Sequence, residues 1–146
     1  ALHTRNEFEY FYGEPRGNVI RFAHRAIDNG ADLVLGSGPH VVRGFEIYNK
    51  RFIAYSLGNF CVYGRFNLSG PSGKSLILKV QLKRDGTFEN GKIIPVKIKR
   101  PGIPVIDSSG YIIKLIKKLS VEDFGTNSPY IDDAGNISIN KKLLPK

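Results

Sequence analysis

The sequence predicts an α/β (α+β) fold rich in β-hairpins, with a second helix late in the chain. Three observations lead to this prediction. An amphipathic helical pattern is followed at once by the short apolar run ADLVLG, residues 31–36. Two pairs of strand-like segments are separated by the turn sequences at 49–50 and 85–86. A second amphipathic pattern covers residues 110–120, GYIIKLIKKLS.

Length and composition indicate a single domain with a sizeable core, since the chain has 146 residues, 41% of them hydrophobic. We expect no transmembrane segment, because no apolar run reaches roughly 18 residues. The start, ALHTRNEFEY, lacks the apolar stretch of a secretory signal, and the chain has no Met, so we expect a fragment or a processed chain. Its single cysteine, Cys61, lies in the apolar context NFCVY and is predicted to be a buried structural thiol.

The net charge is +9, with 22 Lys and Arg against 13 Asp and Glu. Such a balance favours anionic partners: nucleic acid, anionic lipid or an acidic polymer. No nucleic-acid-binding motif accompanies the charge, so we predict no specific nucleic-acid partner. Solvated strand and helix faces are the favoured explanation of the excess, and a surface for a polyanion is the second.

Residues 1–17 hold no clear element and are predicted to be an extended loop. A helix follows, with Asn18 as its N-cap and Gly30 just beyond its end. The expected apolar face of this helix consists of Val19, Ile20, Phe22, Ala23, Ala26 and Ile27. His24 falls largely on the other face and is expected at the surface. The run 31–36 then predicts a short strand covered on both faces.

The middle of the chain reads as two hairpins, 44–48 with 51–56 and 75–83 with 91–100, joined by a Gly- and Ser-rich loop over 63–75. On the second hairpin we expect one face to carry Leu76, Leu78, Val80 and Leu82 and the returning strand to alternate at Ile94, Val96 and Ile98. Pro95 predicts an edge strand or a bulge. Residues 101–110 read as a connector in which Ser108 or Ser109 caps the second helix, and a small hairpin is predicted over 130–139.

Candidate chemistry gathers in three loops: GEPRGN at 13–18, GSGPH at 36–40 and SLGNF at 56–60. Ligand sites in α/β sheets lie at the carboxyl ends of strands, where 36–40 falls. His40 alone is a weak indication of a metal, since metal sites draw three or four ligands from the protein. Ser37 and His40 could be a nucleophile and its base, but no third acidic residue or GxSxG turn accompanies them, which disfavours that interpretation.

Residues 26–60, AIDNGADLVLGSGPHVVRGFEIYNKRFIAYSLGNF, closely resemble the CapA family of poly-γ-glutamate capsule biosynthesis proteins. FYGEPRGN before them and YGRFNLSGP after them fit the same family. The resemblance implies a calcineurin-like metallophosphoesterase fold, of which residues 1–100 would be the C-terminal half of a four-layer α/β/β/α sandwich. Residues 101–146 would be a helical and turn-rich extension, with no resemblance to the family.

The resemblance also implies a site for divalent metal, Mn, Zn or Fe, with His40 as a ligand. Proteins of the family typically have histidine where this chain has Ser37, and a hydroxyl is a poor ligand for such metals. We therefore expect an incomplete site, which in this chain alone holds metal weakly or not at all and has little or no activity. His3, with Glu7 as its acid, could match a His-x-Gly-x-Glu element, but Arg5 stands in place of the glycine. We favour an alignment that places His3 after that element.

As substrate-binding residues we predict Arg16, Ser37 and Asn59. For Arg16 a salt bridge to Glu14 is an equal alternative, and for Asn59 a structural role in a buried turn. The resemblance thus implies part of a CapA-like capsule protein, acting on an anionic polymer or a phosphoester at the extracytoplasmic cell envelope. The alternative is a non-enzymatic scaffold or polyanion-binding component of the envelope. Expected partners include the missing N-terminal half or a second copy of the chain.

Overall fold

The computed structural model describes residues 2–5, 7–11, 13–64 and 66–140. The described residues do not include positions 1, 6, 12 and 65, which belong to segments discussed above. They also do not include the last six residues of the expected extension 101–146. The elements, in chain order, are β1 (Glu9–Phe11), β2 (Glu14–Gly17), α1 (Val19–Asp28), β3 (Leu33–Leu35), β4 (Phe45–Tyr48), β5 (Arg51–Ala54), β6 (Lys74–Leu82), β7 (Phe88–Lys99), β8 (Ile103–Ile106), α2 (Tyr111–Phe124), β9 (Tyr130–Ile131) and β10 (Asn136–Ser138). Short 3₁₀ turns occur at Gly70–Gly73 and Gly125–Asn127.

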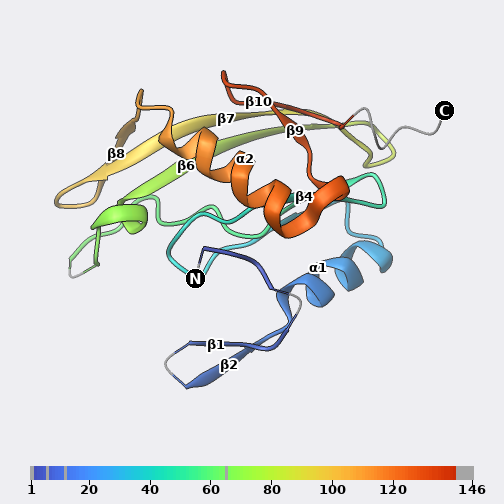
Figure 1. Cartoon of the computed structure of the whole chain (residues 1–146), viewed down its shortest axis with the longest axis horizontal. Helices are drawn as coiled ribbons and strands as arrows, with labels where there is room; N and C mark the ends of the chain where they lie inside the picture. The colour runs from blue at the N-terminus through green and yellow to red at the C-terminus, as the bar shows by residue number, and fades with distance from the viewer. Residues whose placement is uncertain (1, 6, 12, 65, 141–146) are drawn as a thin grey trace.

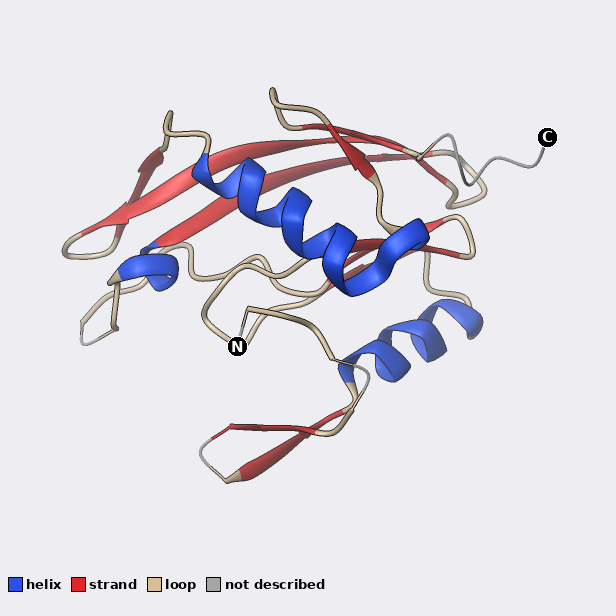
Figure 2. Cartoon of the chain, viewed as in Figure 1, coloured by secondary structure: helices blue, strands red, loops and turns tan. Residues whose placement is uncertain are grey.

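The strands form two main sheets and a separate hairpin (Figure 1). The small sheet has the order β3-β5-β4, and the five-stranded sheet has the order β6-β7-β10-β9, with β8 also paired to β7. Helix α2 packs against strands of both sheets, whereas α1 packs on the small sheet alone (Figure 2). The β1–β2 hairpin projects beside α1 (Figure 2). This arrangement confirms the predicted mixed α/β (α+β) class. None of the helices in the described residues could cross a membrane.

One core joins the two sheets to α2. Its centre is a row of three aromatic rings. The ring centroid of Phe52 lies 5.1 Å from that of Phe45 and 4.9 Å from that of Phe88. At Gly44, an added Cβ would meet the backbone of α2 at 3.0 Å, so the glycine allows the helix to approach β4 closely. The Ser120 hydroxyl accepts a hydrogen bond from the Phe45 amide at 2.8 Å. Because β10 and α2 contribute to this core, residues 101–140 share it with the first part of the chain.

A second cluster holds α1 against the small sheet. Asn18 caps the helix, as predicted: its Oδ1 accepts a hydrogen bond from the Arg21 amide at 2.8 Å. The buried side chains are Ala23 and Ile27. Phe22, expected on the apolar face, is 73% exposed, because only the face that contacts the sheet is covered. His24, expected at the surface, is partly buried and lies flat against Tyr48 with ring centroids 3.7 Å apart.

The predicted hairpins are confirmed. β4 and β5 pair across Asn49 and Lys50, which have the positive φ of a two-residue turn, 48° and 64°. The 85–86 turn joins β6 to β7, and β9 pairs with β10. The prediction for 1–17 is wrong, because β1 and β2 form a hairpin there. The connector prediction is also wrong, because Ile103–Ile106 form β8 on the edge of β7.

Several finer predictions for the second half also need correction. β7 is not an edge strand, since it pairs with β6, β8 and β10. Pro95 lies between the part of β7 that pairs with β10 and the part of β7 that pairs with β8. Ile93 rather than Ile94 faces the main core, opposite Leu78. The N-cap of α2 is Gly110, and the Ser109 hydroxyl accepts from the Tyr111 amide at 3.3 Å.

The prediction of a buried Cys61 is wrong, because the residue is exposed. Its segment leaves the core after Asn59, so the apolar neighbours in the sequence do not enclose the thiol. The adjacent Phe60 is exposed as well.

Candidate functional site

The GSGPH loop begins where β3 ends, and close backbone contact holds it to the segment after β5. β3 runs parallel to β5, so both carboxyl ends lie at the same edge of the small sheet. The Gly36 amide donates to the Ala54 carbonyl at 2.7 Å, and the Leu57 amide donates to the Gly36 carbonyl at 3.2 Å. A Cβ on Gly36 would lie 2.4 Å from the Tyr55 carbonyl oxygen. Only glycine therefore permits this approach.

His40 and Asn59, which come from two of the predicted loops, form a hydrogen-bonded pair. The Asn59 amide nitrogen donates to the carbonyls of His40 at 3.2 Å and Ser72 at 3.0 Å. Its oxygen therefore faces His40 Nδ1, at 2.8 Å. Since an amide oxygen only accepts, Nδ1 carries the proton and Nε2 keeps its lone pair. Asn59, 5% exposed, thus orients an exposed imidazole whose Nε2 is available as a metal ligand or a base.

A single imidazole does not make a metal centre. Among the described residues no three His, Cys, Asp or Glu side chains form a group that could hold an ion. His3, considered above as a ligand, instead lies with its Nδ1 2.7 Å from a carboxylate oxygen of Asp123 near the end of α2. The Thr4 amide donates to the other oxygen of that carboxylate at 2.8 Å. The described residues therefore do not supply a full set of metal ligands.

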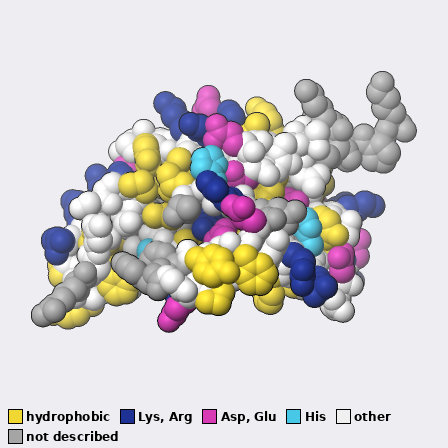
Figure 3. Space-filling view, turned by 60° about the horizontal axis from the view of Figure 1, so that its bottom comes forward, with side chains coloured by type: hydrophobic (Ala, Val, Ile, Leu, Met, Phe, Trp, Pro, Cys, Tyr) yellow, Lys and Arg dark blue, Asp and Glu magenta, His cyan; other side chains and the backbone are white. Residues whose placement is uncertain are grey.

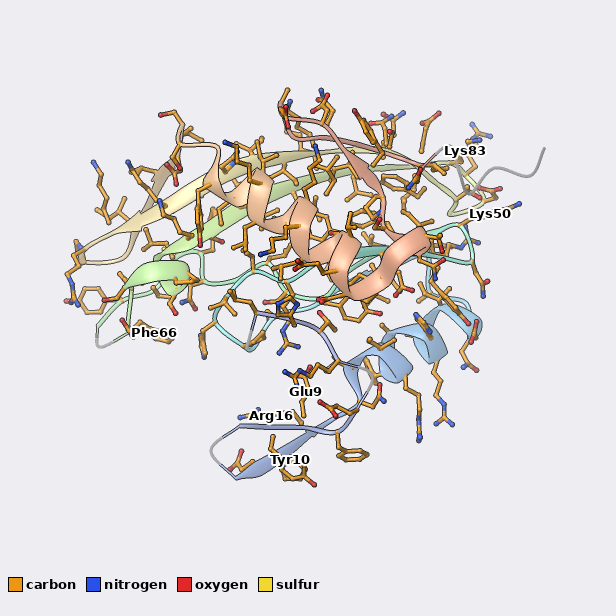
Figure 4. The ribbon with its side chains drawn as sticks, in the orientation of Figure 1. Glu9, Tyr10, Arg16, Lys50, Phe66 and Lys83 are labelled. Carbon is orange, nitrogen blue, oxygen red and sulfur yellow. The ribbon has the colours of Figure 1, made fainter. Side chains whose placement is uncertain are left out.

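Beside the GSGPH loop lies a cavity of about 400 Å³ between the N-terminal segment and the small sheet. The structure brings Arg16 and Ser37 together in its wall, whereas His40 and Asn59 are not among the described residues that line it. Figure 4 shows Glu9 and Arg16 on the hairpin side of this region. The lining residues are His3, Arg5, Glu7, Phe8, Glu9, Tyr10, Arg16, Val19, Ser37, Gly38, Pro39, Arg43 and Tyr55.

Arg43 and Arg16, which both line the cavity, differ in burial and in the strength of their ion pairs. Arg43 is only 4% exposed and forms a two-pronged ion pair with Glu9, with N–O distances of 3.0 and 2.9 Å. This pair fixes the N-terminal hairpin to the body of the molecule. Arg16 lies 3.5 Å from Glu14, and both side chains are largely exposed. The salt bridge considered for Arg16 is therefore present, but water screens it.

Behind the cavity lies a buried polar cluster that the sequence analysis missed. Glu46, 2% exposed, accepts hydrogen bonds from the Tyr55 hydroxyl at 2.7 Å and from Asn127 at 3.2 Å. His24 Nε2 lies 2.9 Å from the same carboxylate. Burial, together with the negative charge of Glu46, raises the pKa of Tyr55, so the phenol stays a neutral donor. One feature indicated such a cluster: a glutamate in the apolar strand GFEIY, next to a strand predicted to be covered on both faces.

The chain is similar in sequence to several known proteins. The family described as "Bacterial capsule synthesis protein PGA_cap" matches residues 1–63. The capsule biosynthesis protein CapA of Bacillus anthracis is 38% identical over 139 residues, which cover 92% of this chain and 32% of that protein. The PGA biosynthesis protein CapA of Bacillus subtilis is 34% identical over 85 residues, 58% of this chain and 21% of that protein. An uncharacterized protein of Sinorhizobium fredii, y4sH, is 53% identical over 47 residues, 32% of this chain and 10% of that protein.

The fold and the matches together define a class, a mixed α+β segment consistent with part of a metallophosphoesterase-like domain. Within that class the chain is CapA-like, related to the capsule biosynthesis proteins named above. The chain spans a third or less of the length of these relatives. The match to the Bacillus anthracis protein covers 92% of the chain and therefore extends into residues 101–146.

Proposed function

We propose that this chain is part of a protein of capsule or poly-γ-glutamate biosynthesis at the extracytoplasmic face of the cell envelope. In this proposal the cavity beside the GSGPH loop binds an acidic polymer or a phosphoester. The observation that carries it is the position of the cavity: its described lining falls within residues 1–63, the region that matches the capsule synthesis family. Its described lining includes three arginines, Arg5, Arg16 and Arg43, against two glutamates, Glu7 and Glu9, which pair with Arg5 and Arg43. The remaining excess of positive charge suits an anionic ligand.

Ser37 and Arg16 are proposed to contact the ligand directly. Ser37 is exposed at the end of β3 and offers a hydroxyl. Arg16 also lines the cavity, and its salt bridge with Glu14 is exposed, so an anion could compete for the guanidinium group. Arg43 is already held by Glu9 and would mainly add positive potential. Asn59 is proposed to act through His40, by orienting the imidazole.

His40 is proposed as one metal ligand of the intact protein, because Asn59 fixes its ring through Nδ1 and its Nε2 has no hydrogen-bond partner among the described residues. The remaining ligands would come from the part of the relatives' length that this chain does not span. In the intact protein the reaction class would be metal-dependent phosphoester hydrolysis, and this chain alone would show little of it.

A non-enzymatic role in polyanion binding is the second candidate. The observation that favours it is Ser37, which stands where the resemblance leads us to expect a second histidine ligand. The net charge of +9 adds general attraction for acidic polymers.

In either case β3 is an outer strand of the small sheet, and in the described residues nothing pairs with its second edge. That edge would accept the remainder of the protein or a second copy.

The test measures metal content and polymer binding in parallel. Labelled poly-γ-glutamate is titrated into the chain, into Arg16→Gln, and into Arg84→Gln, a control of equal charge in the exposed 83–86 turn. Metal held after incubation with Mn²⁺ or Zn²⁺ is measured by mass spectrometry for the chain, Ser37→His and His40→Ala.

We expect polymer binding that weakens with salt and with Arg16→Gln but not with Arg84→Gln. Metal retained by the chain and lost in His40→Ala would favour the hydrolase. Polymer binding without metal would favour the scaffold. Equal loss in both arginine variants would contradict a polymer site in the cavity.

A further inference from the structure

A second surface lies on the outer side of α1, away from the small sheet. A shallow groove of about 470 Å³ runs between this helix and the N-terminal hairpin. Five side chains dominate it, and we call them the Arg–Phe surface: Phe8, Arg16, Arg21, Phe22 and Arg25. Figure 3, in which the lower side of the molecule comes forward, shows hydrophobic side chains gathered beside basic ones.

The two phenylalanines of the surface are solvent-exposed. Phe22 is 73% exposed and Phe8 is 61% exposed, although α1 buries Ala23 and Ile27 on its other side. A scattered exposed phenylalanine needs no explanation, but two that line one groove form a local apolar patch. Such a patch at the rim of a basic surface is typical of an interaction site.

Arg16 pairs with Glu14, but the charges of Arg21 and Arg25 are not neutralised locally. Arg21 and Arg25 are one helical turn apart, a spacing at which like charges repel each other. In the described part of the chain neither has an ion pair, and the groove lining contains no acidic residue. Asp28, the acidic residue of α1, is hydrogen-bonded to Tyr48 and Asn49 instead. An anionic partner would relieve this repulsion.

We propose that the Arg–Phe surface docks the protein onto the surface of an anionic lipid bilayer. Helices that lie in the membrane interface combine basic residues, which meet lipid phosphates, with aromatic residues, which enter the headgroup and acyl boundary. The surface offers both on one side of α1. A fully hydrated polyanion would satisfy the arginines but would leave both phenyl rings in water, so the lipid surface is the better match. The docking goes beyond the proposed function, since Arg21, Phe22 and Arg25 are absent from the described lining of the cavity beside the GSGPH loop.

The test uses vesicles of phosphatidylcholine alone and of equimolar phosphatidylglycerol and phosphatidylcholine. The chain contains no tryptophan, so Phe22→Trp places a single fluorescent reporter on the surface. Because the position is exposed, this variant should fold normally, which circular dichroism would check. We expect it to bind the anionic vesicles with a blue shift of its emission, and to bind the neutral vesicles weakly.

Two further variants separate charge from insertion. Arg21→Gln/Arg25→Gln should weaken binding about 25-fold at low salt, from about fivefold for each arginine near an anionic lipid surface. Phe22→Ser should weaken it by about fivefold or more, since an apolar side chain no longer leaves water. The matched control, Lys114→Gln/Lys118→Gln, removes the same charge from the exposed face of α2 and should change binding little.

Three results would overturn the proposal. If the α2 control weakened vesicle binding as much as Arg21→Gln/Arg25→Gln, the net charge of the chain alone would explain the binding. Unchanged binding in Phe22→Ser, or no blue shift in Phe22→Trp, would exclude insertion into the interface. Poly-γ-glutamate binding that depends on Arg21 and Arg25, without vesicle binding, would assign the surface to the polymer. Arg16 lines both the cavity and the groove, so the polymer assay compares Arg16→Gln with Arg21→Gln/Arg25→Gln. Polymer binding lost in the first variant alone supports the cavity, and vesicle binding lost in the second supports the docking surface, so the two proposals can fail independently.

Discussion

The small sheet and the five-stranded sheet share one aromatic core but differ in how they treat charge. The small sheet and its flanking loops bury Arg43 and Glu46, each held by specific partners at the cavity beside the GSGPH loop. None of the described lysines of the five-stranded sheet is buried, and Asp107 beside it is its buried charge in the described residues. Buried charges cost stability unless they are fully paired. The region that matches the capsule synthesis family therefore contains buried charges whose desolvation lowers stability unless their partners compensate for it.

The largest expected effect on stability comes from the aromatic core that the two sheets share. Phe52→Ala should lower the free energy of unfolding by about 3–5 kcal/mol, because it opens a cavity between Phe45 and Phe88. Urea denaturation followed by both circular dichroism and tyrosine fluorescence would measure the loss. One shared core predicts coincident transitions by the two probes. Separate transitions would show that the two sheets unfold as independent units.

A smaller loss is expected from the buried cluster of the small sheet. Glu46→Ala should cost about 2–3 kcal/mol, because the Tyr55 hydroxyl loses its acceptor while buried. Glu46→Gln, which keeps an acceptor oxygen, should cost less. Thermal denaturation of both variants would decide. If alanine and glutamine at this position cost the same, the acceptor oxygen that glutamine retains would not be what stabilises the buried Tyr55 hydroxyl.

Asn59→Ala should cost about 1–2 kcal/mol, because the carbonyls of His40 and Ser72 lose their donor. The same change should release the His40 ring, so that the proton no longer stays on Nδ1. Nitrogen NMR of the imidazole would report the tautomer. A ring that kept one tautomer in the variant would contradict the orienting role given to Asn59, whatever the stability change.

The smallest effect is expected at the five-stranded sheet. A hydrogen bond from Lys74 at 2.6 Å lowers the pKa of Asp107 below its ordinary value. A carboxyl whose folded pKa is depressed stabilises the fold above its unfolded pKa, and that contribution is lost as the pH falls through the folded pKa. Asp107→Asn should therefore cost about 1 kcal/mol at neutral pH and progressively less below about pH 4.

The control for Asp107 is a surface pair. Lys117→Ala removes an ion pair of 3.4 Å to the exposed Asp133 and should change stability by less than about 0.5 kcal/mol at any pH. Denaturation series at neutral and acidic pH would compare the two variants. A pH-independent loss in Asp107→Asn would mean that packing, rather than charge, holds Asp107 in place.

Much of the fold could be predicted from local features. The Asn18 cap, the turn at 49–50 and the turn at 85–86 depend on residues within a few positions of one another, and each is confirmed. The position of the GSGPH loop at the end of β3 is confirmed for the same reason. Of the candidate site, the sequence predicted Ser37 at a strand end and Arg16 in the loop before the first helix. It could not show that they line one cavity or that Asn59 holds His40.

By itself, then, the sequence determined the kinds of element, their turns and the loops that carry polar groups, because short-range backbone preferences decide these. Only the tertiary structure decided which side chains the packing covers. Phe22 stayed in water because α1 meets the sheet with its other face, and Glu46 was buried because β4 lies between α1 and α2. Burial depends on elements far apart in the chain, so no local pattern could assign it. Both the buried polar cluster and the Arg–Phe surface arise at that level.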